Sequence, residues 1–400
     1  MLTSPIKILC FLLATVAVFA GFTLNETDLT PKEPTKDAPY VVFISIDGYR
    51  FDYTEKYHPK VISQLADQGL QARSLRPSFP TLTFPNHISL VTGKFPQNHG
   101  IVANFFYDKD TKEEYRMNNS AAVADGKWYS GEPLWIAAEN SGITAATMFW
   151  VGNMATYGGK RASYTRDYDK NVNNQDRSQQ VIDWLSLPES RRPHFITLYF
   201  DVVDTKGHAF GPESNEVALA VADVDSAIGK LVDWTAQQKL DINFFVVSDH
   251  GMKTVDEGKV ICLRQSVDLK DFKVMERGPM TMLYSDDMSL ITQTVEQLNK
   301  IPNVTAYLKK DFPSRLNFNN SNRIGDIIVT AAEHYYLVPE VLLPDAKCET
   351  RTKATHGWDI EDTEMHGIFY ANGPNIVDHK VIDTIRNVDI YPMVLDILGA

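Results

Sequence analysis

Three apolar runs rich in Phe, Val and Ile constrain the fold of this chain most, at residues 40–46, 195–204 and 243–252. Runs of this composition are typical of buried strands. Helical patterns at residues 59–70 and 214–238 lie between them. Alternating strands and helices are typical of α/β proteins, because the connecting helices cover the faces of parallel strands. The pattern therefore predicts an α/β fold with a mostly parallel central sheet flanked by helices.

Each run carries an acidic side chain at or just after its end. These side chains are Asp47, Asp204 and Asp249, and His250 directly follows the last of them. In an open α/β sheet the carboxyl ends of the strands face the ligand crevice, and a carboxylate beside an imidazole suits a divalent transition metal. Two plainer interpretations stay open here: Asp249-His250-Gly251 is only a turn, or each lone Asp is a helix N-cap.

Two further histidines extend this pattern. His208 comes four residues after Asp204 in DTKGHAFGP, and His356 lies in THGWD, before the strand-like run GIFYANGP. Together the three Asp and three His suit two zinc ions held by nitrogen and oxygen ligands. Paired ions of this kind are used for in-line displacement at phosphorus.

A candidate nucleophile lies in PSFPTLTFPNHISLVTG, residues 77–93, which ends in a predicted amphipathic helix that begins near Pro85. Thr83 then lies at the helix N-terminus, where the macrodipole favours an alkoxide and backbone N–H groups favour phosphate oxygens. Threonine is inert at its free pKa, so it needs metal coordination to act as a nucleophile. The alternative is that Thr81 or Thr83 only caps the helix.

From about Tyr40 to Ala400 the chain resembles the ecto-nucleotide pyrophosphatase/phosphodiesterase family of the alkaline phosphatase superfamily. Seven ordered motifs carry the resemblance: FISIDGYR, PTLTFPNHISLVTG, HGIVANFFYD, DTKGHAFGP, VVSDHGM, HGWD and NVDIYPMVLDILG. The chain is most similar to the shorter members, which lack a nuclease-like domain. The resemblance implies an alkaline-phosphatase-like catalytic domain over residues 40–400 and hydrolysis of nucleotide phosphoanhydride or phosphodiester bonds.

The resemblance also implies roles for particular residues. It assigns one zinc ion to Asp204, His208 and His356, and the other to Asp47, Thr83, Asp249 and His250. Thr83 is the implied nucleophile, and Asn104 is the implied hydrogen-bond donor to a non-bridging phosphate oxygen. The aromatic positions that stack on the substrate fall on Phe84 and Tyr164, and stacking on a flat base adds about 1 kcal/mol. An aromatic residue in the first turn of a helix, such as Phe84, is also typical of a core.

The implied mechanism has two displacements. Thr83 Oγ attacks phosphorus and expels the leaving group to give a phospho-threonine ester, which water then cleaves from the opposite side. Metal-bound water ionises near pH 7, so no separate general base is needed. Because the metals require neutral imidazoles, activity is expected to fall in acid as His208, His250 and His356 protonate.

Other histidines are given smaller roles. His366 lies close to His356, but the family pattern does not use it, and we expect a residue at the entry of a strand. His87 and His99 flank the Thr83 helix and are expected to pack or to support ligands. The chain departs from the family at DVVD, residues 201–204, where members often carry an acidic pair and a proline. This change removes no ligand, but it affects the shape of the substrate groove.

Charge narrows the class of partner. The formal net charge is -12, from 39 basic and 51 acidic residues. A protein that tracks a nucleic-acid backbone needs a basic stripe, so polymer binding is not expected. A small nucleotide or dinucleotide is compatible, because metals supply local positive charge. Two stretches, residues 104–132 and 157–177, are interpreted as inserted loops over the site.

The N-terminus predicts secretion. Lys7 and the apolar residues 8–20 form a signal peptide pattern, with cleavage after Ala20 and a flexible linker at residues 21–39. An uncleaved anchor is the alternative. Membrane association is expected only if such an anchor is retained or if one follows Ala400.

Sequons and cysteines are consistent with that location. The sequons begin at Asn25, Asn118, Asn303 and Asn319. Cys10 leaves with the signal peptide, so Cys262 and Cys348 form a disulfide or remain two free buried thiols.

Alternatives to a nucleotide phosphodiesterase stay open. The same metals can serve a choline-type or lysophospholipid phosphodiesterase, and a non-catalytic extracellular binding protein on this fold is a third interpretation. Sulfatase chemistry is disfavoured, because neither Cys nor Ser occupies the position of the nucleophile.

Overall fold

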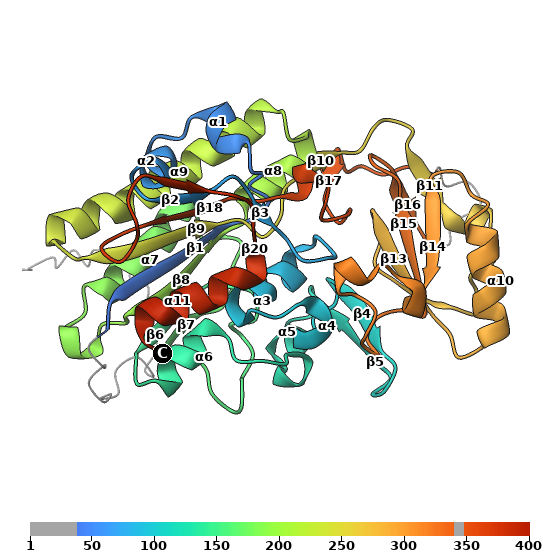
Figure 1. Ribbon diagram of the computed structural model, residues 1–400, viewed down its shortest axis with the longest axis horizontal. Coiled ribbons are helices and arrows are strands. Elements are labelled where there is room, and N and C mark those ends of the chain that lie inside the picture. The colour runs from blue at the N-terminus through green and yellow to red at the C-terminus, as the bar shows by residue number, and fades with distance from the viewer. Residues whose placement is uncertain (1–37, 340–347) are drawn as a thin grey trace, which may run out of the picture. The chain divides into compact units, whose positions relative to one another are not determined.

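The computed structural model describes residues 38–339 and 348–400, and these belong to one compact unit that spans Glu33–Ala400. The expected signal peptide, the Asn25 sequon and all but the last two residues of the expected linker lie outside the described residues. An eight-stranded sheet with strand order β19-β2-β18-β9-β1-β8-β6-β7 forms the centre (Figure 1).

The predicted, mostly parallel sheet is confirmed. Strand β1 (Tyr40–Ile46) runs parallel to both neighbours, β8 (Phe195–Phe200) and β9 (Ile242–Val247). Strand β18 (Phe369–Asn372) reverses direction beside β9. The remaining strands are β2 (Leu70–Ala72), β6 (Ala145–Met148), β7 (Tyr164–Arg166) and β19 (Lys380–Ile382).

Helices cover both faces of the sheet because successive side chains of β1 point to opposite sides. Val41 and Phe43 enter one core, with helices α3 (Thr83–Thr92), α6 (Leu134–Asn140) and α11 (Ile390–Leu398). Val42 and Ile44 enter the other, with α2 (Lys60–Gln68), α7 (Asn174–Leu185) and α9 (Asn215–Gln238). Each such side chain contributes about 1.5–3 kcal/mol on burial. The helices predicted at residues 59–70 and 214–238 correspond to α2 and α9.

A second, antiparallel sheet is drawn in orange and yellow in Figure 1. Its strands, in the order β12-β13-β15-β14, are β12 (Lys273–Met275), β13 (Met280–Tyr284), β15 (Ile327–Ala331) and β14 (Val304–Leu308). Helix α10 (Met288–Leu298) packs Ile291 and Leu298 on one face of this sheet.

A disulfide joins Cys262 to Cys348, with their Cα atoms 5.9 Å apart. Cys262 ends β11 (Val260–Cys262), which pairs with β16 (Tyr336–Val338). The disulfide interpretation is therefore confirmed, and the alternative of two free thiols is wrong.

The two stretches expected as loops do lie over the site, since Met117 and Tyr168 line a cavity together with Asp47 and Thr83. The expectation that they are plain loops is wrong, because both contain regular structure. Residues 104–132 hold the hairpin of β4 (Phe105–Asp108) and β5 (Glu113–Arg116), followed by α5 (Ser120–Ala124). Phe106 and Tyr115 stack across the hairpin with ring centroids 4.9 Å apart, which gives this segment an apolar core. Residues 157–177 contain β7, the edge strand of the central sheet.

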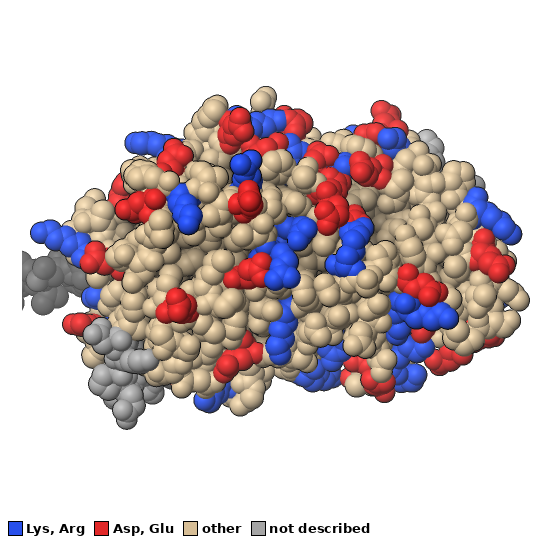
Figure 2. Space-filling model, viewed as in Figure 1, with Lys and Arg blue, Asp and Glu red and all other residues tan. Residues whose placement is uncertain are grey.

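Surface charges are mixed. Figure 2 shows one face of the molecule, where Lys and Arg side chains lie among Asp and Glu side chains. Charge is thus balanced locally on this face, although the whole chain carries -12. Across the described part of the chain, no helix combines the length and apolar character that crossing a bilayer needs.

Candidate metal centre and active site

The predicted ligands meet at one edge of the central sheet. Asp47 follows β1, and Asp249 and His250 follow β9, so parallel neighbouring strands deliver them to the same edge. Asp204 and His208 lie on α8 (Val202–Phe210), which begins two residues after β8 ends. His356 directly follows the short strand β17 (Ala354–Thr355), and Thr83 begins α3.

One ligand group consists of Asp204, His208 and His356, whose ligand atoms all lie within 4.8 Å of one another. Helix α8 places residues four apart on the same face, and His208 Nε2 lies 3.4 Å from Asp204 Oδ1. The two imidazoles meet through their Nε2 atoms at 3.2 Å. Each Nδ1 lies within hydrogen-bond distance of a backbone carbonyl, of Ala354 for His208 and of Thr81 for His356, which aims Nε2 at the centre.

A second group shares Asp204 and adds Asp47 and His250, again within 4.8 Å. His250 Nε2 lies 3.4 Å from Asp47 Oδ1 and 3.1 Å from Asp249 Oδ2. The Thr83 hydroxyl lies 3.2 Å from the same nitrogen. The two groups are in direct contact, because the rings of His250 and His356 stack with centroids 3.5 Å apart and an interplanar angle of 13°.

One oxygen of each aspartate in this cluster lacks a hydrogen-bond partner on the protein. Among buried side-chain atoms in the described residues, Asp47 Oδ1, Asp204 Oδ1 and Asp249 Oδ2 have no hydrogen-bond partner. An uncompensated buried charge is costly, so such oxygens call for a cation. Histidine nitrogen with aspartate oxygen is a typical donor set for zinc. The residues present therefore fit divalent metal ions in two overlapping groups.

Electrostatics point the same way. Burial, followed by the charges of Asp249 and Asp204, raises the pKa of Asp47 well above its usual range. Burial also raises the pKa of Asp204. Burial and the neighbouring His250 and His208 hold the pKa of His356 well below its ordinary value, which keeps that ring in the neutral form that binds metal. Burial opposes protonation of His250, but Asp249 raises its pKa overall.

Thr83 is not used as a helix cap. The N-cap of α3 is Leu82, whose side chain makes no capping hydrogen bond. The Thr81 hydroxyl instead accepts from the Gly357 backbone N–H at 2.8 Å and donates to the Trp358 carbonyl at 3.1 Å. Neither threonine therefore has the capping role that the sequence left open, and the half-buried Thr83 hydroxyl faces the ligand cluster.

Asn104 is held at the start of α3. Its side-chain oxygen accepts from the Phe84 backbone N–H at 3.0 Å, which leaves the amide NH₂ as the donor. The next residue along, Phe105, donates its backbone N–H to Glu276 Oε2 at 3.1 Å, and this bond ties the Asn104 segment to the second sheet. Burial raises the pKa of Glu276 to about 7.

A cavity of about 480 Å³ opens on the ligand cluster and is lined by Asp47, Thr83, Asp204, Phe84 and Tyr168, among others. This volume suits a small ligand. Phe84 is partly buried against the core and also lines the cavity, so its core packing is confirmed and its stacking on a substrate stays a prediction.

The structure does not place Tyr164 at the site. Strand β7 turns this ring into the core, where it is 1% exposed and packs near Trp184, and its hydroxyl donates to the Arg191 carbonyl at 3.0 Å. Tyr168, beyond the end of β7, lines the cavity and is 47% exposed. Tyr168 was missed because the bounds of β7 were not visible in the sequence. These bounds decide which tyrosine faces inward.

The other histidines serve the framework, as expected. Both ring nitrogens of His366 are engaged, by the Ser74 hydroxyl at 2.9 Å and the Ile360 carbonyl at 2.8 Å. His87 supports a ligand: its Nδ1 lies 3.2 Å from Asp249 Oδ2, and its Nε2 lies 2.8 Å from the Ser45 hydroxyl.

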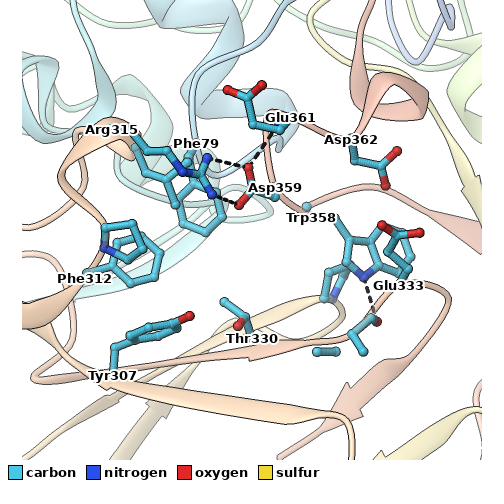
Figure 3. A pocket seen from close by; sticks show the side chains of 16 residues that line it. Phe79, Tyr307, Phe312, Arg315, Thr330, Glu333, Trp358, Asp359, Glu361 and Asp362 are labelled. Carbon is cyan, nitrogen blue, oxygen red and sulfur yellow. Dashed lines mark hydrogen bonds and ion pairs between the residues drawn. The ribbon is translucent and has the colours of Figure 1, made fainter.

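A second cavity, of about 420 Å³, borders the loop that follows His356 (Figure 3). Aromatic rings of Phe79, Tyr307 and Phe312 form one side, and Arg315 pairs with Asp359 on another through bonds of 2.7 and 2.5 Å. None of the seven predicted metal ligands lines this cavity, so the chemistry of the ligand cluster does not extend into it.

Comparisons with known proteins agree with this geometry. A model of the type I phosphodiesterase/nucleotide pyrophosphatase family matches residues 41–359. Human ectonucleotide pyrophosphatase/phosphodiesterase family member 1 is 32% identical over 379 residues, which cover 91% of this chain and 40% of that protein. A venom phosphodiesterase of Crotalus durissus collilineatus is 31% identical and is matched over 91% of this chain and 44% of its own length. The chain thus spans less than half the length of these relatives.

Solved structures extend the comparison. Murine ectonucleotide pyrophosphatase/phosphodiesterase 5 superposes with a TM-score of 0.84 at 27% identity, over 90% of this chain and 95% of that one. The same murine protein was also solved as an inactive threonine-to-alanine variant in complex with AMP, at 26% identity and the same TM-score. With the family match over most of its length, the chain belongs to the ecto-nucleotide pyrophosphatase/phosphodiesterase family of the alkaline phosphatase superfamily.

Proposed function

We propose that the protein is a secreted phosphodiesterase with two zinc ions that hydrolyses phosphoanhydride or phosphodiester bonds of small nucleotides and dinucleotides. The convergence of three unpartnered aspartate oxygens, three histidines and the Thr83 hydroxyl carries the proposal. The names of the relatives support the reaction class, and the AMP complex of the murine relative supports a nucleotide substrate.

We assign the ligands as the sequence predicts. Asp204, His208 and His356 would hold one ion, and Asp47, Thr83, Asp249 and His250 would hold the other. When bound, the ions would lower the pKa of the threonine hydroxyl and of water and neutralise charge on the phosphoryl oxygens.

Thr83 supplies the nucleophile. Its Oγ, having lost its proton to solvent, forms a bond to phosphorus while the bond to the leaving oxygen breaks, and that oxygen departs with the bonding electrons. Water then forms a bond to the phosphorus of the phospho-threonine ester from the opposite side and releases one proton. The bond between Thr83 Oγ and phosphorus breaks, Thr83 Oγ takes up a proton from solvent, and the monophosphate leaves.

The start of α3 stabilises the phosphoryl group. Helix N-termini carry about half a positive charge and present free backbone N–H groups, so they favour phosphate oxygens. The Asn104 amide adds a donor that is already oriented by the Phe84 backbone, and pre-oriented donors are worth more than mobile ones.

The cavity offers rings for a base but, outside the assigned ligands, no unpaired carboxylate for a quaternary ammonium. Phe84 and Tyr168 offer rings on which a flat base stacks. A quaternary ammonium needs a free carboxylate or an aromatic cage. Apart from the assigned ligands, Asp201 is the carboxylate among the residues that line the cavity, and Arg177 and Tyr168 already engage it.

Secretion is part of the proposal. The N-terminal signal pattern predicts it, and the disulfide between Cys262 and Cys348 supports it, because such bonds persist in oxidising compartments. The Asn118 and Asn303 side chains are exposed, as glycan acceptors must be. N-terminal sequencing of the protein recovered from culture medium tests this inference, and a mature chain that begins at Gly21 is the expected result.

Replacement of Thr83 by Ala tests the reaction. Turnover of the nitrophenyl ester of thymidine 5′-monophosphate is expected to fall by at least about 1000-fold, or about 4 kcal/mol of barrier. Thr83→Ser is the matched control and is expected to keep a measurable rate, because it keeps a hydroxyl. Unchanged turnover in Thr83→Ala, or in enzyme treated with a chelator, contradicts the proposal. Parallel assays with ATP, NAD and glycerophosphocholine identify the substrate class.

A further inference from the structure

The Tyr168 side chain is held in place although it lies on the surface. Its ring is 47% exposed, in the segment between β7 and α7. Its hydroxyl donates to Asp201 Oδ2 at 2.5 Å, and its ring lies edge-on to Phe149 and Tyr199 at centroid distances of 5.6 and 6.2 Å. A free exposed tyrosine samples several rotamers, so these contacts need an explanation.

Asp201 binds the Tyr168 hydroxyl and does not cap the helix that it precedes. It is the N-cap residue of α8, a position where an Asp side chain normally accepts from the first helical N–H groups. No side-chain capping bond is present here. One carboxylate oxygen instead accepts from Tyr168, and the other lies 2.8 Å from a terminal nitrogen of Arg177.

Arg177 anchors the arrangement from within the protein. It lies on α7, is 2% exposed, and donates to the backbone carbonyls of Val172 at 3.0 Å and Tyr199 at 3.1 Å. Its guanidinium lies 5.2 Å from the Phe149 ring centroid and 5.9 Å from that of Tyr168. A planar group fixed by several hydrogen bonds is a rigid support for the side chains that it contacts.

The ion pair also suits the position of the cavity. Asp201 lines the same cavity as Asp47 and Thr83, where an unpaired carboxylate repels a phosphate. Arg177 neutralises this charge, so Asp201 orients Tyr168 without opposing an anionic substrate.

We propose that Arg177 and Asp201 are positioning residues that fix Tyr168 as a preformed wall for the base, and thereby set a preference for phosphodiesters that carry a base. The proposal rests on the proposed nucleotide phosphodiesterase function. Immobilising a side chain on binding weakens affinity, and a side chain that is already fixed avoids this loss.

Tyr168→Phe is the principal test, because it keeps the ring and removes only the bond to Asp201. For the nitrophenyl ester of thymidine 5′-monophosphate, we expect KM to rise about 3- to 10-fold with kcat within about twofold. For nitrophenyl methyl phosphate, which has no base, we expect no change in kcat/KM. Asp201→Asn is expected to reproduce this split. Tyr57→Phe is the matched control, because it removes a hydroxyl that donates to the Pro212 carbonyl outside the cavity.

A binding measurement gives a second readout that does not depend on turnover. In the Thr83→Ala background, calorimetry is expected to show that Tyr168→Phe weakens binding of thymidine 5′-monophosphate about 3- to 10-fold, with binding of inorganic phosphate unchanged. An equal change for both ligands, or for both esters, assigns Arg177 and Asp201 a purely structural role and overturns the proposal, as does wild-type behaviour of Tyr168→Phe. Failure of the proposed function shows differently, as turnover that survives Thr83→Ala.

Discussion

Two clusters of charged side chains begin at the same two strand ends and differ in where their partners come from. Beyond Asp47 and Asp249, the chain continues to Arg50 and Lys253, which belong to what we call the framework cluster. Its members are Arg50, Asp52, Glu213, Lys253, Glu333, Asp362 and Glu364. Arg50 lies 2.6–2.9 Å from three of these carboxylates, and Lys253 lies 2.7–3.2 Å from three.

The framework cluster stabilises the fold through ion pairs, whereas the ligand cluster is proposed to bind metal ions. In the framework cluster each cation is surrounded by carboxylates of the protein, which is the condition under which buried ion pairs are tolerated. In the ligand cluster, one oxygen each of Asp47, Asp204 and Asp249 has no hydrogen-bond partner among the described residues, and the nearest nitrogens belong to histidines. Stability and activity are therefore expected to respond in opposite ways when the two clusters are altered.

The largest expected effect follows from Asp47→Asn in the ligand cluster. Turnover is expected to fall by at least about 1000-fold, because the change removes a metal ligand. The metal-free protein is expected to keep or gain stability, because the change removes a buried charge whose neighbours repel it. Zinc at about 100 times its Kd is expected to stabilise the wild type by about 2.7 kcal/mol and the variant by less. Turnover assays and thermal melts with and without chelator measure both quantities. A lower Tm of the variant in chelator contradicts the comparison.

The framework cluster is expected to give the reverse result. Lys253→Met leaves Asp362, the most buried of its three carboxylates, without its cation, whereas Glu364 keeps Arg50. The change is expected to lower the free energy of unfolding by about 2–3 kcal/mol, with kcat within about threefold of wild type. Urea denaturation in chelator measures the loss. Lys259→Met is the matched control: Lys259 pairs with Asp256 at a more exposed site, and the expected loss is below about 1 kcal/mol. Equal losses of stability in the two variants argue against the framework cluster as a stabilising unit.

A smaller expected effect distinguishes loss of stability in acid from loss of activity in acid. Burial lowers the pKa of His99 to about 3, and its Nε2 lies 3.1 Å from both the Ser89 hydroxyl and the Pro85 carbonyl. An unfolded histidine titrates near pH 6.5. Below that pH the unfolded chain binds one more proton than the folded protein, so the free energy of unfolding falls as pH falls, by at most about 1.4 kcal/mol per unit.

His99→Gln is expected to flatten this dependence. The measurement compares urea midpoints at pH 7 and pH 5 in wild type and variant. Loss of activity between these pH values is expected to persist in the variant, because protonation of His250, whose pKa Asp249 raises, competes with metal binding. Identical pH slopes for stability rule out His99 as the source of acid sensitivity.

Much of the ligand cluster could be predicted because its residues follow strands whose apolar composition is unmistakable. Asp47, Asp249 and His250 lie directly past β1 and β9, and parallel pairing brings them together. Asp204 was placed at the end of a strand, but β8 ends at Phe200 and Asp204 lies on α8. The ligand set is unaffected, because a helix also brings residues four apart onto one face.

The walls of the cavity were harder to predict. A strand of three residues such as β7 carries too little periodicity to show that Tyr164 points inward and Tyr168 lies beyond it. The hairpin of β4 and β5 was predicted to be a loop because the charged residues between Phe106 and Tyr115 obscure the strand pattern in the sequence. The partners of Arg50 and Lys253 come from segments up to 314 residues away, and such pairings depend on tertiary structure alone.

The stacked rings of His250 and His356 make the two halves of the centre mechanically inseparable. If each ring holds one of the proposed ions, a larger ion on one side would tilt its imidazole and push against the neighbouring one. Engineering the protein to bind a mixed pair of metals would therefore require changes to both ligand groups, starting with the stacked pair of His250 and His356.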